Sequence, residues 1–182
     1  MILEQFGDNP FLPLFYKEPE RYAFTVELFF MTERYKQLQT ELTQDLFYDF
    51  TIADYTFIKT LLFARINLKD EEYRLFQKMF SILSQAFPNP DLLVYFHREV
   101  DVLQNNIDKR GRQYETDISN NYLTNVQNSY FEYLRNTVQF PVLVIDVSNM
   151  DFMNNESQYE TLKSLLRKEY RPGVQRVSLR SE

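Results

Sequence analysis

The 182-residue sequence contains no cysteine, a single histidine and only three glycines. The absence of cysteine excludes a disulfide scaffold, thiol catalysis and a Cys-ligated zinc site, and it fits a reducing compartment. One histidine excludes a metal centre built from several histidines. No apolar run approaches the ~18 residues of a membrane-spanning helix, and the first residues do not resemble a secretory leader. We therefore expect a cytoplasmic protein with no membrane segment.

The overall composition is that of an ordinary globular chain. Hydrophobic residues make up 44% and charged residues 25% of the sequence, and a length of 182 residues predicts a single domain over residues 1–182. The 26 acidic residues outnumber the 20 Lys and Arg, so the formal charge is −6. Because nucleic acid is also negatively charged, we expect no nucleic-acid partner.

Short apolar runs alternate with stretches of helical spacing along the chain. Residues 92–96 and 142–147 are predicted to be strands covered on both faces, and 1–3 and 50–53 are weaker strand candidates. The predicted helices cover residues 22–42, 70–87, 120–138 and 156–170, and 171–182 is predicted to be a loop or a frayed end. This alternation predicts an α/β fold with a parallel sheet.

In such folds, ligands bind beyond the carboxyl ends of the strands, which directs attention to Glu4, Asp54, His97 and Asp146. Glu4 is either a general base or a solvated acid at the start of a loop. The single His97 favours a polar surface or loop role. For Asp146, bonding to loop amides is favoured over a metal or nucleotide contact.

Three further features allow two interpretations each. Arg110 and Arg112 bracket Gly111, which suits phosphate binding or simply a cationic helix C-terminus, with Gly111 at positive φ. Glu27 lies within the otherwise apolar stretch 24–31, so it either faces solvent or binds something. The aromatic residues crowded into the first 24 positions either sandwich a planar ligand or pack in the core.

Taken in order, several segments resemble the bacterial deoxynucleoside kinases of the deoxyadenosine/deoxyguanosine kinase type. The similar segments are Leu3-Glu4-Gln5-Phe6, Asp8-Asn9-Pro10-Phe11, Phe15-Tyr16-Lys17-Glu18-Pro19, the stretch from Val94 to Glu115 with its Arg-Gly-Arg-x-x-Glu, and Val142 to Phe152. The resemblance extends from Ile2 to about Tyr170. It implies a P-loop kinase-like parallel sheet flanked by helices, with a lid at about residues 108–118.

The resemblance also implies an activity, the ATP-dependent 5′-phosphorylation of a deoxynucleoside, with Mg²⁺ as the accompanying ion. Glu4 matches the catalytic carboxylate, and Arg110 and Arg112 match lid arginines that hold the donor phosphates. The substrate and nucleotide positions that it assigns are Tyr16 and Glu115 at the sugar 3′-hydroxyl, Phe6 or Phe11 with Phe63 around the base, and Asp151 and Phe152 in the nucleotide-base loop.

Two positions depart from the family pattern. Glu27 stands where relatives usually have a glutamine that pairs with the base. An ionised carboxylate only accepts hydrogen bonds, so Glu27 favours a base edge with N–H groups, such as guanine, or is itself protonated for adenine; a purine is expected. Asp54-Tyr55-Thr56 stands where the family has an acid, an arginine and a serine. Asp54 is a candidate substrate contact, and Lys59 is the candidate to replace the arginine's charge.

The largest departure is the absence of the motif Gly-x-x-x-x-Gly-Lys-Ser/Thr from the 182 residues. Met1 lies where the family's second strand begins, so we expect the first, central strand, the P-loop and the first helix to be absent from this chain. Either the sequence begins at an internal methionine of a longer gene product or it is a shortened, inactive relative. The alternative function is a non-catalytic kinase-like subunit that pairs with an active kinase. Because the family commonly dimerises through long helices, a homodimer through residues 22–42 or 70–87 is also expected.

Overall fold

The computed structural model describes residues 1–4, 9–43, 49–112, 115 and 117–178, which form two compact units. The first unit consists of Met1–Pro88 and Arg112–Ser129, and the second of Asn89–Gly111 and Tyr130–Glu182. The expectation of one domain over the whole chain stays a prediction.

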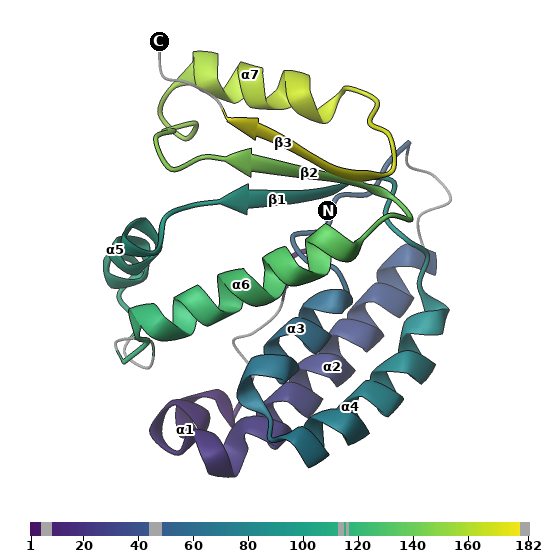
Figure 1. The fold of residues 1–182 in the computed structure, drawn as a ribbon, viewed down its shortest axis with the longest axis vertical. Helices are drawn as coiled ribbons and strands as arrows, with labels where there is room; N and C mark the ends of the chain where they lie inside the picture. The colour runs from purple at the N-terminus through teal and green to yellow at the C-terminus, as the bar shows by residue number, and fades with distance from the viewer. Residues whose placement is uncertain (5–8, 44–48, 113–114, 116, 179–182) are drawn as a thin grey trace. The chain divides into compact units, whose positions relative to one another are not determined.

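The second unit contains a parallel three-stranded sheet (Figure 1). Its strands are β1 (Leu93–His97), β2 (Pro141–Asp146) and β3 (Gly173–Ser178), in the order β1-β2-β3. The central strand β2 is apolar and buried from Val142 to Ile145, as expected for a strand covered on both faces. The α/β prediction with a parallel sheet is confirmed.

Helices cover both faces of this sheet (Figure 1). On one face, Leu143 and Ile145 pack against Leu162 of α7 (Glu156–Leu166). On the other face, Val142 and Val144 pack against Leu134 of α6 (Asn120–Asn136). Because side chains alternate along a strand, one uninterrupted apolar run supplies both layers of the core.

After β1, the chain forms α5 (Val100–Arg110), which ends at Gly111. Gly111 has φ +68° and ψ +28°, and its N–H donates to the carbonyl of Ile107. This left-handed conformation closes a helix, and glycine adopts it without steric cost. The prediction of positive φ at Gly111 is confirmed.

The first unit is helical. It contains α1 (Leu12–Lys17), α2 (Pro19–Thr43), α3 (Ile58–Asn67), α4 (Asp70–Leu83) and the 3₁₀ turn η1 (Ser84–Ala86), and also the first part of α6. Its core includes the buried side chains of Phe15, Val26, Met31, Phe57 and Phe76. The two weak strand candidates at 1–3 and 50–53 form only a single parallel bridge between Ile2 and Ala53. Because Glu4 and Asp54 follow Ile2 and Ala53 in sequence, this bridge brings the two acidic residues close together.

The prediction of a loop or frayed end over 171–182 was wrong for residues 173–178, which form β3 and pair with β2 in parallel. The sequence Gly-Val-Gln-Arg-Val-Ser has no apolar run and only two valines, at 174 and 177. An edge strand needs a partner on one side only. Its pairing with β2, rather than a local sequence pattern, stabilises residues 173–178 as a strand. None of the described helices is both long enough and apolar enough to cross a membrane.

Candidate functional site

The side chain of Glu4 is held between two cations of the first unit. The Nε of Arg34, from α2, donates to Oε1 of Glu4 at 2.7 Å, and the Nζ of Lys59, from α3, donates to Oε2 at 2.5 Å. The backbone N–H of Glu4 donates to Oδ1 of Asp54 at 2.9 Å. Three separate segments thus fix both the backbone and the carboxylate of Glu4, directly after the bridge at Ile2.

Burial raises the pKa of the Glu4 carboxyl, but the charges and hydrogen bonds of Arg34 and Lys59 outweigh burial and leave this pKa below its ordinary value. Glu4 is therefore ionised at neutral pH. An ionised carboxylate in a fixed position can accept a proton from a neighbouring hydroxyl, which is the requirement for a general base. Of the two interpretations of Glu4 from the sequence, a merely solvated acid does not fit these contacts.

Arg34 is a residue of this cluster that the sequence analysis missed. Its side chain is only 5% exposed, its Nη1 donates to the hydroxyl of Thr60 at 3.0 Å, and its guanidinium lies 5.0 Å from the ring centroid of Phe30. A buried charge is costly unless it is paired, so Arg34 and Glu4 stabilise each other's ionised form.

Glu27 is the second buried acid of the first unit. It is 2% exposed, and its Oε1 accepts a hydrogen bond from Nδ2 of Asn67 at 2.6 Å. Its Oε2 is buried with no hydrogen-bond partner among the described residues. Burial raises the pKa of Glu27 to about 7, although the hydrogen bond from Asn67 and the charge of Arg34 oppose the rise. The interpretation that Glu27 faces solvent was wrong, because the side chain points inward to Asn67.

On each of the helices α2 and α3, two polar side chains of the buried cluster are seven residues apart in sequence. Glu27 and Arg34 lie two helical turns apart on α2, as Asn67 and Thr60 do on α3, and the hydrogen bonds join Glu27 to Asn67 and Arg34 to Thr60. Residues at i and i+7 share one face of a helix, and the two helices run antiparallel here. A charged residue repeated at this spacing was the one signal in the sequence that could have identified Arg34.

Tyr122 borders the same acid. Burial raises the pKa of its hydroxyl to about 12, and it shares a hydrogen bond with Asn67 and feels the charge of Glu27. Tyr55, which stands where the family has an arginine, is buried, and its hydroxyl donates to Oε1 of Gln37 at 2.7 Å. The positive charge beside Glu4 therefore comes from Arg34 and Lys59, not from position 55.

The lid prediction concerns residues 108–118, of which 113, 114 and 116 lie outside the described residues. Within the first unit, Nη1 of Arg112 donates to Oε1 of Glu115 at 3.1 Å, and Glu115 is only 6% exposed. Arg110 is the last residue of α5, in the second unit. Arg112 and Glu115 thus form an ion pair, and a joint role with Arg110 stays a prediction.

Several aromatic residues that the resemblance assigns to the base or sugar belong to the first unit. Phe11 and Tyr16 pack against its core, and Tyr16 lies edge-on to Phe15 with ring centroids 5.4 Å apart. The ring centroid of Phe63 is 5.8 Å from Nζ of Lys59. Phe63 is therefore adjacent to the cation that holds Glu4. Phe6 lies outside the described residues.

The candidates in the second unit lie at the carboxyl ends of the strands or on the loop that follows β2. His97 ends β1, in register with Asp146 at the end of β2. Oδ1 of Asp146 accepts the backbone N–H of Ser148 at 3.0 Å, and this bond is the main cause of a pKa below the ordinary value. The predicted bonding of Asp146 to loop amides is confirmed.

The base-loop candidates Asp151 and Phe152 also lie in the second unit. Oδ2 of Asp151 accepts from the side-chain amide of Asn154 at 2.9 Å, and the ring of Phe152 stacks on Phe96 with centroids 6.2 Å apart. These contacts order the loop that follows β2, and the nucleotide role of the two residues stays a prediction.

The described residues do not form a magnesium cage of their own. No three His, Cys, Asp or Glu side chains gather within this part of the chain in a way that could hold a metal ion, and both oxygens of Glu4 already accept from cations. In phosphoryl transfer, Mg²⁺ is held largely by the phosphates of the nucleotide, with one or two carboxylates.

Comparison with solved structures identifies the class of fold. The chain is similar to a deoxyadenosine kinase from M. mycoides solved with bound dATP, with a TM-score of 0.74 and 22% sequence identity over 91% of this chain and 84% of that one. The same enzyme with bound dCTP gives a TM-score of 0.73 at 21% identity. The sheet, its covering helices and these neighbours define an α/β domain of the P-loop kinase fold.

Sequence comparison then gives the family. The family model for deoxynucleoside kinase matches residues 1–170. A deoxyguanosine kinase from Bacillus subtilis is 31% identical over 89% of this chain and 81% of its own length, and a deoxyadenosine/deoxycytidine kinase from the same organism is 27% identical over 88% and 76%. The chain belongs to the deoxynucleoside kinase family.

Proposed function

We propose that this protein takes part in the ATP-dependent phosphorylation of a deoxynucleoside at its 5′-hydroxyl, with Glu4 as the general base. The observation that best supports this proposal is the ionised carboxylate of Glu4, fixed by Arg34 at 2.7 Å and Lys59 at 2.5 Å. A structural ion pair needs only one cation, whereas two cations and an anchored backbone amide hold the carboxylate in one orientation. The kinase activity of the relatives supports the same reaction class.

In the proposed reaction, the 5′-oxygen of the nucleoside attacks the γ-phosphorus of ATP. The bond between that phosphorus and the bridging oxygen breaks, ADP leaves with the electron pair, and the hydroxyl proton passes to Glu4. Because Arg34 and Lys59 keep Glu4 ionised before the transfer, it is ready to accept the proton.

The proposed sugar and phosphate contacts involve the lid. Glu115, with Tyr16 of α1, binds the 3′-hydroxyl, and Arg112 and Arg110 neutralise charge that develops on the transferred phosphoryl group. The ion pair of Arg112 with Glu115 supports this division, because it keeps a guanidinium next to the sugar-binding carboxylate. Asp54 contributes mainly by holding the backbone of Glu4, and it remains a candidate substrate contact.

The proposed base site is formed around Glu27. A buried oxygen without a partner is uncommon in proteins and needs a donor, and Oε2 of Glu27 is such an oxygen. When ionised, it accepts N–H groups of a guanine edge; when protonated, it also donates, as adenine requires. A purine is therefore the preferred base, sandwiched by Phe63 with Phe11 or Phe6, while Asp151 and Phe152 face the base of the nucleotide.

A second candidate is a non-catalytic subunit that pairs with an active kinase, and it is favoured by the absence of a Gly-x-x-x-x-Gly-Lys-Ser/Thr motif from these 182 residues. In the same way, the exposed Leu75 and Ile82, two turns apart on α4, favour self-association through a long helix. This candidate predicts a chain without phosphate transfer of its own that pairs with an active kinase. The homodimer through a long helix is a separate expectation, and α4 is its proposed surface.

The test measures binding and turnover separately. Each of the four deoxynucleosides is added to the 182-residue chain in a thermal-unfolding assay, because a ligand that binds only the folded state raises the melting temperature. We expect deoxyguanosine or deoxyadenosine to give the largest rise, and ATP-dependent turnover of the same nucleoside by a form of the protein that carries a Gly-x-x-x-x-Gly-Lys-Ser/Thr motif. If no deoxynucleoside raises the melting temperature and such a form shows no turnover, the proposal is wrong. A preference for pyrimidines contradicts only the role of Glu27.

A further inference from the structure

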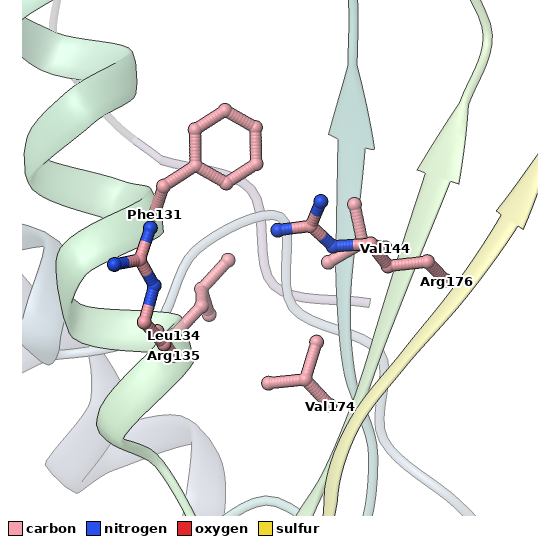
Figure 2. A pocket seen from close by; sticks show the side chains of 6 residues that line it. All are labelled: Phe131, Leu134, Arg135, Val144, Val174 and Arg176. Atoms are coloured by element: carbon pink, nitrogen blue, oxygen red, sulfur yellow. The ribbon is translucent and has the colours of Figure 1, made fainter.

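A cavity of about 210 Å³ lies in the second unit, between α6 and the face of the sheet near β3. It is lined by Phe131, Leu134, Arg135, Val144, Val174 and Arg176 (Figure 2). Phe131, Leu134 and Arg135 come from α6, and the other three residues come from β2 and β3. None of the six has a part in the proposed phosphoryl transfer.

The strand pairing explains why this cavity has an apolar floor and two cationic side chains. Val142 of β2 is in register with Val174 of β3, and Val144 is in register with Arg176. Alternation along β3 therefore places Arg176 on the same face as Val174, toward α6. One turn of α6 adds the ring of Phe131, the buried Leu134 and the adjacent Arg135.

The two guanidinium groups have no acidic partner among the described residues. No ion pair of Arg135 or Arg176 with an Asp or Glu occurs in that part of the chain, while the guanidinium of Arg176 lies 5.7 Å from the ring centroid of Phe131. In Figure 2 both guanidinium groups lie toward the Phe131 side of the cavity, whereas Val174 lies at its other end. The cavity thus has a cationic end and an apolar end.

The volume limits the size of an occupant. The cavity is partly open to solvent. An enclosed apolar cavity of about 150 Å³ accepts one benzene molecule, so about 210 Å³ admits one ring, and a small head group extends toward the opening. A neutral apolar molecule leaves the guanidinium groups unused, and a free inorganic anion leaves the valine and leucine surface uncovered. An occupant that uses both ends has a ring-sized apolar body and one anionic head.

We propose that this cavity binds a small amphiphilic anion, whose ring lies between Phe131, Leu134 and Val174 and whose carboxylate or phosphate head is bound by Arg135 and Arg176. The competing explanation is that the two arginine stems only cover apolar surface of the sheet while their charges stay in water. The explanations differ in one respect: only a binding site discriminates an anion from a neutral molecule of the same shape.

The experiment is a methyl NMR titration of the 182-residue chain with three probes: phenyl phosphate, benzoate and neutral benzyl alcohol. We expect phenyl phosphate or benzoate to shift the methyl signals of Leu134, Val144 and Val174 saturably, with a Kd below about 1 mM. We expect benzyl alcohol to bind at least about tenfold more weakly, since it lacks the charge. The tighter of the two anions identifies the head group that the site prefers.

Variants test the role of the two charges. Arg135→Gln with Arg176→Gln is expected to raise the Kd of the anion by about tenfold or more, and to leave the melting temperature nearly unchanged because both side chains are exposed. Arg167→Gln, an exposed arginine at the end of α7 that does not line the cavity, is the matched control and leaves the Kd unchanged. The proposal is overturned if neither anion gives saturable shifts, if benzyl alcohol binds as well as the anions, or if the double variant binds them unchanged.

Discussion

In the second unit, the central strand β2 buries four consecutive apolar side chains, Val142 to Ile145, between α7 and α6. In the first unit, by contrast, the helices α2 and α3 bury charged and polar side chains against each other, Glu27 with Asn67 and Arg34 with Thr60. An apolar core is stabilised by removal of its surface from water. A buried polar cluster gains little net stability but fixes the orientation of its groups. The first unit thus has, beside an apolar core of its own, a buried polar cluster that holds Glu4, whereas the core around β2 in the second unit is apolar.

The largest expected effect on stability is at Arg34, in the polar cluster. Arg34→Ala leaves the carboxylate of Glu4 with Lys59 as its one remaining cation and removes the partner of Thr60. Loss of one member of a buried ion pair costs about 3–5 kcal/mol, measured as the fall in the free energy of unfolding in urea. Arg21→Ala is the control, because Arg21 and Glu18 form an exposed ion pair worth at most about 1 kcal/mol. Equal losses for the two variants would show that the Glu4 cluster is not buried.

The second unit allows a corresponding test of its apolar core. Ile145 is fully buried on β2, so Ile145→Ala is expected to lower the free energy of unfolding by about 2–5 kcal/mol through lost burial and a residual cavity. Ile82→Ala removes the same atoms from a side chain that is 70% exposed, and we expect a change within about 0.5 kcal/mol. A small effect at Ile145 would contradict the assignment of β2 as the central, doubly covered strand.

A smaller effect is expected from pH, because the first unit contains a buried acid with a raised pKa, Glu27. The pKa of Glu27 is about 7 in the folded state, against an ordinary value of 4.5. Between these pH values the folded chain binds more protons than the unfolded chain, so stability due to Glu27 is full below about pH 4.5 and is lost as the pH rises to about 7. The difference corresponds to at most about 3 kcal/mol.

Glu27→Gln isolates this effect, because it keeps the shape of the side chain and cannot titrate. Urea unfolding of both proteins between pH 5 and 8 is expected to show wild type losing stability relative to Glu27→Gln as the pH rises. Glu4 has the opposite sign: its pKa lies below the ordinary value, so its contribution is lost only as the pH falls. Parallel stability curves for wild type and Glu27→Gln would show that Glu27 is not buried as an acid.

The same comparison explains how much the sequence could predict. The strands β1 and β2 were predicted within one residue at either end, since a short apolar run is a local signal. The helix predicted over residues 70–87 begins at the first residue of α4. The edge strand β3 was not predicted, because its stability comes from pairing with β2. Local sequence patterns thus predict the apolar strands β1 and β2, but they do not predict β3, which depends on its neighbouring strand.

The polar cluster was predicted only in part, for a related physical reason. Glu27 was recognisable as an acid among apolar residues, and Glu4 through its place after a strand and its match to the family. Arg34, however, reaches Glu4 across 30 positions of sequence and Lys59 across 55. The seven-residue spacing from Glu27 places Arg34 on the same face of α2, but it does not indicate which residue Arg34 pairs with. The partners of the Glu4 carboxylate are determined only when the helices pack.

The measurement that tests the central claim most directly is the turnover number of Glu4→Gln with deoxyguanosine and ATP, in a form of the protein that carries a Gly-x-x-x-x-Gly-Lys-Ser/Thr motif. Glutamine keeps the shape of the side chain and a carbonyl oxygen for Arg34, but it cannot take up the 5′-hydroxyl proton. We expect kcat to fall by about 10²- to 10⁴-fold, while the dissociation constant of deoxyguanosine and the melting temperature change little. A kcat equal to that of the wild type, in a folded variant that binds the nucleoside, would remove Glu4 from the role of general base.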